Sequence, residues 1–165
     1  MTDITIANTD WAILAAVRDA LAGARIDGLP VFAAVSVTTS AQQAQECQFR
    51  TSPVAVVRYL ATTQQAGVED HLACQVSLEV LLAVKVPAGL DEAPRLQEVL
   101  RLANAARNAV NAAKPAAACD WSDGQRALRR LEFGPPKVDS SESAPWAVAV
   151  LPLAATYTLE SDTAN

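Results

Sequence analysis

The chain is poor in the residues that most enzyme sites require. Its 165 residues include one histidine, His71, so a Ser-His-Asp triad has a single possible centre and a multi-histidine metal site has none. Glycine occurs six times, and the closest pair, Gly23 and Gly28, is followed by Leu29. This spacing excludes the G-x-G-x-x-G and phosphate-loop motifs. We therefore expect no catalytic residues, no cofactor and no metal.

Cysteine is also scarce, and no leader or membrane segment is evident. The cysteines are three, an odd number, and are irregularly spaced: Cys47, Cys74 and Cys119. Such a set favours reduced thiols in the cytosol over a disulfide framework. The N-terminus lacks the basic and apolar regions of a signal peptide, and polar residues interrupt the apolar stretch 72–86. We expect a cytoplasmic protein with no membrane partner.

Basic residues are outnumbered by acidic ones. Thirteen Lys and Arg stand against 18 Asp and Glu, for a net charge of −5, so the composition does not favour specific nucleic-acid binding. Hydrophobic residues make up 51% and charged residues 19%, as in globular proteins. The length predicts one domain over residues 1–165, with a polar tail at 160–165.

Two segments have helical periodicity. The first, 9–22, can be capped by Thr9 or Asp10, and its apolar residues are spaced for one face: Trp11, Leu14, Val17 and Leu21. The second, 92–113, follows the possible cap Asp91 and precedes Pro115. Its predicted buried stripe is Leu96, Val99, Leu100, Ala103, Ala106 and Val110, with Arg95 facing outward.

The clearest pattern is strict alternation between residues 72 and 86. The even positions are all apolar: Leu72, Cys74, Val76, Leu78, Val80, Leu82, Val84 and Val86. This alternation predicts an amphipathic strand of about 50 Å, at roughly 3.4 Å per residue. A strand of this length would overhang a small domain, so a hairpin partner or another subunit must cover it.

Four shorter segments are predicted to be strands, over residues 31–37, 53–60, 125–133 and 146–159. The segment 125–133 could also be a short helix. Pro152 inside the last segment indicates an edge strand or a bulge. Polar connections are expected over 38–52, 62–70 and 134–145, and we take the loops 38–52 and 134–145 as candidate contact surfaces.

The predicted element order is therefore α-β-β-β-α-β-β. One-sided helices and strands favour an α+β domain with both helices on one face of a mostly antiparallel or mixed sheet of about five strands. The other face would be solvated or used in assembly.

The densest basic patch of the sequence consists of Arg126, Arg129, Arg130 and Lys137. It is a candidate contact for phosphate or an acidic partner. In a strand, Arg126 and Arg130 would share one face and Arg129 would take the other. Trp121 and Trp146 flank loops and are candidate interface anchors, although both could equally be core aromatics.

Three other clusters have simpler interpretations. Glu69, Asp70 and His71 are adjacent on an extended chain and cannot converge on one ion, so a turn before a strand is the default. Asp120–Gly124 begins like a calcium loop, but position twelve is Leu131 instead of Glu. Cys74 belongs to the buried alternation and is predicted to be a core residue.

The order of elements resembles that of tail-terminator, or tail-completion, proteins of long-tailed bacteriophages and prophages. The resemblance rests on these segments: Thr9–Leu14, Pro30–Phe32, His71–Val86, Leu96–Val110, Pro145–Trp146 and Tyr157. It implies a non-enzymatic subunit that forms a closed ring of six copies. That ring stops growth of the tail tube and joins it to the head. No catalytic or contact residue can be carried over from a motif.

The resemblance implies partners of three kinds: further copies of the chain, other tail or head–tail connector proteins, and DNA that passes through the ring without specific binding. The protein would act in the bacterial cytoplasm during assembly and then in the virion tail. Two alternatives remain open, a small α+β ligand-binding or enzymatic domain and a tail-tube or other minor tail subunit. A tube subunit would polymerise openly, whereas a terminator would form closed rings.

Overall fold

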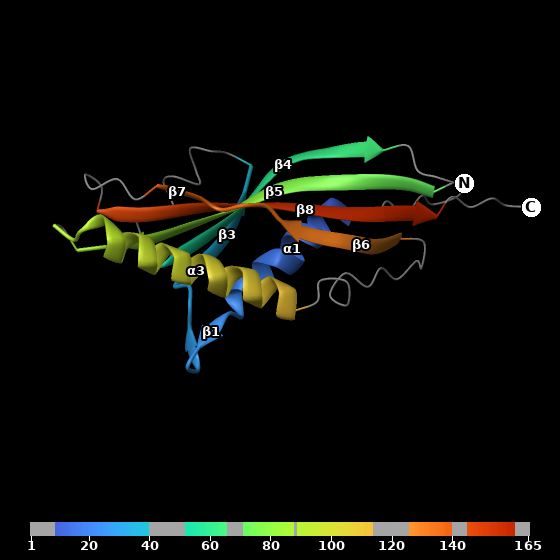
Figure 1. Ribbon diagram of the computed structural model, residues 1–165. Coiled ribbons are helices and arrows are strands. Elements are labelled where there is room, and N and C mark those ends of the chain that lie inside the picture. The colour runs from blue at the N-terminus through green and yellow to red at the C-terminus, as the bar shows by residue number, and fades with distance from the viewer. Residues whose placement is uncertain are drawn as a thin grey trace, which may run out of the picture.

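The computed structural model describes residues 9–39, 52–65, 71–87, 89–113, 126–139 and 145–160. Within them, helices and a mixed sheet form an α+β fold, which confirms the predicted class (Figure 1). The elements are α1 (Thr9–Ala22), β1 (Arg25–Ile26), β2 (Leu29–Pro30), β3 (Ala34–Thr38), β4 (Val54–Gln65), β5 (His71–Lys85), α3 (Glu92–Ala112), β6 (Arg126–Phe133), β7 (Lys137–Asp139) and β8 (Trp146–Glu160).

The main sheet has the strand order β3-β4-β5-β8-β6, and β7 adds to β8 beside β6. Only the β3–β4 pair is parallel. Of the segment 125–133, Arg126–Phe133 form the strand β6 and not a helix. The predicted connection 134–145 contains one more strand, β7, which raises the main sheet from the expected five strands to six.

The long alternating strand is β5, and it lies in the middle of the sheet. It pairs with β8 from His71–Glu160 to Lys85–Trp146 and with β4 from Ala73 to Ala83. The overhang expected from its length is thus covered by its two neighbours, β8 with 15 residues and β4 with 12. Its even-numbered residues from Cys74 to Val84 are buried, as the alternation predicted.

Strand β4 extends further than its apolar residues indicated. The segment 62–65 was expected to be a polar connection, but Thr62 and Gln64 pair with Val76 and Cys74 of β5. A bulge at Leu60 precedes this extension. The prediction was wrong because the backbone of β5 offers hydrogen-bond partners there, whatever the polarity of the side chains.

Pro152 does not mark an edge strand, since β8 lies between β5 and the pair β6 and β7. The Pro152 carbonyl accepts a hydrogen bond of 2.8 Å from the Gly134 amide, in the break between β6 and β7. In an extended strand, the backbone N–H and C=O groups of one residue point toward the same neighbouring strand. The missing N–H of Pro152 therefore faces this break, where the ladder needs no donor.

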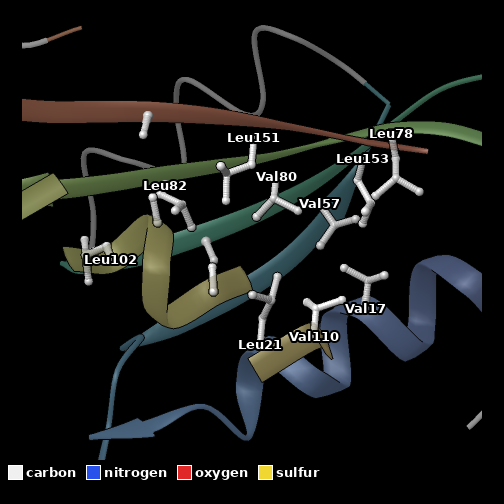
Figure 2. Packing of buried hydrophobic residues seen from close by; sticks show 14 of the residues in the cluster. Val17, Leu21, Val57, Leu78, Val80, Leu82, Leu102, Val110, Leu151 and Leu153 are labelled. Atoms are coloured by element: carbon white, nitrogen blue, oxygen red, sulfur yellow. The ribbon is translucent and has the colours of Figure 1, made fainter. Parts of the chain in front are cut away.

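Both helices cover the same face of the sheet, and the main core lies between them and the strands (Figure 1). Side chains from both layers meet there, including Val17, Leu21, Val57, Leu78, Val80, Leu82, Leu102, Val110, Leu151 and Leu153 (Figure 2). We call the opposite side of the sheet the open face. The open face carries a smaller apolar cluster of Val54, Val56, Ala83 and Trp146.

The buried stripe of α3 is rotated from the predicted one. Leu96 and Leu100 were expected inside, yet each is 36% exposed, whereas Leu102 is fully buried. Arg95, expected outside, is 1% exposed. Helix α3 contacts β5 and β8, and its buried side carries Val99, Ala103, Ala106 and Val110. In this orientation Leu96 and Leu100 lie on the outer flank of the helix.

Replacing Val80 with Asp should prevent folding, because Val80 is fully buried at the centre of the core and a carboxylate there has no partner. We expect a loss on the order of 4 kcal/mol or more and no cooperative thermal transition by circular dichroism. Ser77→Asp, on the other face of the same strand, is the matched control and should unfold cooperatively. A folded Val80→Asp protein with normal thermal unfolding would show that this face is not core.

Candidate assembly interface

The basic residues of β6 do not form the face that the sequence indicated. The register shifts between Leu128 and Arg130, so the backbone of Arg126 pairs with Leu159 and that of Arg130 with Thr156. These β8 positions are an odd number of residues apart and therefore lie on opposite faces. The prediction that Arg126 and Arg130 share a face was wrong, because the bulge adds one residue to the strand.

The bulge instead brings Arg129 and Arg130 to the open face. Arg129 Nε donates to Thr158 Oγ1 at 3.0 Å, and Arg130 forms an exposed ion pair of 2.6 Å with Glu132. Lys137 lies on β7 and pairs with Val150, about 20 Å along β8 from the Arg130 position at 3.4 Å per residue. Lys137 is therefore distant from Arg130 along the sheet, and Glu132 partly neutralises the charge of Arg130.

Of the two candidate tryptophans, the structure describes Trp146, and it describes the candidate loops only in part. Trp146 is 8% exposed and packs with the open-face apolar cluster, a core environment within a single copy. Trp121 lies outside the described residues, as do residues 40–51 of the loop 38–52 and residues 140–144 of the loop 134–145. Asp120–Gly124, Glu69 and Asp70 also lie outside them. Cys74 is a buried free thiol, as predicted.

The structure reveals a polar cluster that the sequence did not indicate, at the N-terminal end of α1. Tyr157 Oη donates to Asp10 Oδ1 at 3.0 Å, and Thr62 Oγ1 donates to Asp10 Oδ2 at 2.7 Å. The Tyr59 and Thr62 hydroxyls are 2.7 Å apart. A carboxylate in the first turn also complements the helix dipole. The Asp10 cluster therefore ties the start of α1 to β4 and β8.

Within the Asp10 cluster, the pKa of Tyr157 is raised well above its ordinary value. The main cause is burial, which penalises the phenolate, and the hydrogen bond to Asp10 adds to it, followed by that to Cys74. The Tyr157 hydroxyl consequently stays protonated and remains a donor. Each carboxylate oxygen of Asp10 accepts a hydrogen bond from one hydroxyl group, and these two bonds fasten α1 to the sheet.

A pocket of about 560 Å³ opens beside the Asp10 cluster. Its lining comes from α1, from β3 and the residue that follows it, and from β4, and consists of Asp10, Trp11, Leu14, Val37, Thr38, Thr39 and Tyr59. Trp11 was expected in the buried stripe of α1 but is 49% exposed. It forms part of the wall of the pocket instead of the core, and Arg18 lies over its ring at 5.9 Å from the centroid.

The opposite end of α1 leads into a hairpin that projects away from both layers (Figure 1). Asp27 and Gly28 have positive φ angles of 52° and 79°, and β1 pairs with β2 on either side of them. An Asp-Gly pair is the usual signal of a two-residue hairpin turn, so the sequence contained this information. Leu29 is 70% exposed and Ile26 is 38% exposed.

No protein-family model and no curated protein matches the chain. In the described ranges, no three His, Cys, Asp or Glu side chains gather closely enough to hold a metal ion. None of the helices in the same part of the chain has the length and apolar character that crossing a membrane requires. The candidate site is therefore defined by surface geometry, namely the pocket and the hairpin at the two ends of α1.

Tyr157→Phe removes one donor to Asp10 and should lower the free energy of unfolding by about 1.5–3 kcal/mol, the usual range for hydrogen bonds to charged groups. Urea denaturation at pH 7 measures this loss. Tyr59→Phe is the matched control. It should cost less, about 0.5–1.5 kcal/mol, because the Tyr59 hydroxyl contacts Thr62 and not the carboxylate. Equal losses of unfolding free energy in the two variants would contradict the conclusion that the Asp10 carboxylate is the main hydrogen-bond acceptor of the cluster.

The raised pKa of Tyr157 also predicts a loss of stability at alkaline pH. The unfolded chain releases the Tyr157 proton near pH 10, whereas the folded chain retains it, so the free energy of unfolding falls as pH rises above about 10. Urea denaturation at pH 8, 9.5 and 11 should show this decline. Tyr157→Phe should show a smaller decline. An identical pH dependence in both proteins would refute the assignment.

Proposed function

We propose that the chain is a non-enzymatic assembly subunit of a bacteriophage or prophage virion, a tail terminator that closes into a ring. That ring would cap the tail tube and join it to the head. The observation that carries the proposal is the projecting hairpin β1–β2, which presents Ile26 and Leu29 to solvent. Exposed apolar side chains on a projecting element are typical of surfaces that bind another protein.

The element order adds to this support. It runs from one helix through strands to the long central strand, then to a second helix and closing strands. This is the order on which the resemblance to tail terminators rests. The subunit would act in the cytoplasm of the bacterial host before it becomes part of the virion tail. Its partners would be further copies and neighbouring tail or head–tail connector proteins.

A second candidate function is the binding of a small ligand in the pocket beside Asp10. Its lining combines a carboxylate, hydroxyls of Thr38 and Tyr59, and apolar walls, as ligand sites often do. Assembly is favoured over it because the hairpin also needs an explanation, and a ligand in the pocket does not provide one. A tail-tube subunit would use similar surfaces but form open polymers instead of rings.

Native mass spectrometry across a concentration series tests the proposed function. We expect a closed species of about six subunits whose size stays constant as the concentration rises, since a closed ring leaves no free interface. Open polymers of increasing length would support a tube subunit instead. A monomer at every concentration would contradict self-assembly and favour the ligand-binding domain.

A further inference from the structure

The hairpin and the pocket lie at opposite ends of α1. The pocket is lined by Asp10, Trp11 and Leu14 from the first turns of the helix, and β1 begins three residues after its last residue, Ala22. The helix has 14 residues and spans about 21 Å at 1.5 Å per residue. The hairpin of one copy therefore cannot reach its own pocket, whereas it could reach that of a second copy.

The hairpin combines apolar side chains with a positive charge. Ile26 and Leu29 are paired across its two strands, and Arg25 lies in the next pair with Pro30. Arg25 donates one bond, of 3.4 Å, to the Gly28 carbonyl within the hairpin. A guanidinium has five N–H donors, so others remain for a carboxylate. Because isolated two-stranded hairpins are marginal in water, a partner surface would stabilise this one.

The pocket has the complementary chemistry. Its walls include aromatic and aliphatic groups, from Trp11, Leu14 and Tyr59, and Asp10 is the one charged residue among the described residues that line it. Each Asp10 oxygen accepts one hydroxyl, and a carboxylate has about four acceptor positions. The nearby Arg18 lies over Trp11, and its charge is paired with Asp19 at 3.0 Å.

A larger groove is a poorer match for the hairpin. This groove has a volume of about 770 Å³ and lies between the C-terminal parts of α1 and α3. Its lining includes Arg25 itself and Arg101, besides Asp19. In the groove, Asp19 is already paired with Arg18 and Arg101 with Glu98, whereas the Asp10 carboxylate beside the pocket is held by hydroxyl groups. An incoming Arg25 therefore finds a better charge partner in the pocket. Charge complementarity therefore selects the pocket.

We propose that the hairpin Arg25–Pro30 of one copy inserts into the pocket beside Asp10 of a second copy, with Leu29 against Trp11 and Tyr59 and with Arg25 at the Asp10 carboxylate. This contact joins two different surfaces, so each copy has one hairpin and one pocket to offer. It specifies the interface of the proposed assembly and rests on that proposal. Repeated around a closed ring, it leaves no hairpin and no pocket unoccupied.

Two variants test the contact, each altering one side of it. Leu29→Asp places a carboxylate on the hairpin, and Trp11→Ala removes the indole against which Leu29 would pack. Leu29 is 70% exposed and Trp11 49%, so both variants should keep the thermal transition of the unaltered protein. We expect each to weaken self-association roughly 30-fold or more, as measured by sedimentation and native mass spectrometry. Leu60→Asp, at another leucine that is 42% exposed, is the matched control and should assemble normally.

The decisive measurement mixes the two variants. The Leu29→Asp chain keeps an intact pocket and the Trp11→Ala chain keeps an intact hairpin, so the mixture should form a 1:1 heterodimer. The heterodimer should not grow, because its free ends are the altered hairpin and the altered pocket, which gain no attraction for each other. The two chains differ in mass, and native mass spectrometry distinguishes the heterodimer from either homodimer. Absence of the heterodimer, when the unaltered chain assembles, would overturn the proposed contact.

The outcomes separate this contact from the proposed function. Closed rings that persist in both variants would overturn the contact and leave the ring proposal intact. A heterodimer in the mixture, together with open polymers of the unaltered chain, would support the contact and contradict a terminator. Loss of assembly in Leu60→Asp as well would overturn the assignment to these two surfaces. An unaltered chain that is monomeric at every concentration would overturn both proposals.

Discussion

The rest of the fold depends on the burial of one apolar strand face. Strand β5 presents an unbroken row of apolar side chains to the helices, and it is paired with a long strand on each side. Since hydrophobic burial is the main favourable term in folding, this row must be covered along its length. Helices α1 and α3 provide the cover and leave the open face to a smaller apolar cluster and polar side chains.

The position of α1 on this core sets the geometry of the candidate site. Hydrogen bonds from Thr62 and Tyr157 to Asp10 hold the start of the helix against β4 and β8. The end of the helix leads directly into the hairpin. A rigid helix therefore separates a projecting apolar element from an acidic pocket by a constant distance. Two different surfaces at constant separation are what a head-to-tail assembly requires.

Sequence patterns located this site only in part. Asp10 was predicted as an alternative cap to Thr9, and Trp11 as part of the buried stripe of the first helix. Both lie within α1 and line a pocket whose other walls include β3 and β4, which are distant in sequence. The arginines of β6 were a candidate contact surface because they lie close together in the sequence. The face of the sheet on which each arginine lies could not be assigned from the sequence. A bulge after Leu128 shifts the alternation of the strand, and no residue type there indicates a bulge.

The sequence alone determined α1 and α3, the buried alternation of β5 and the α+β class, because local periodicity and the need to bury apolar side chains act on neighbouring residues. Only the tertiary structure decided the extension of β4, the central place of Pro152, and which side of α3 faces the sheet. Each of these depends on pairing or docking with a partner remote in the chain. The backbone ladder and the packing angle select among alternatives that the side chains alone permit.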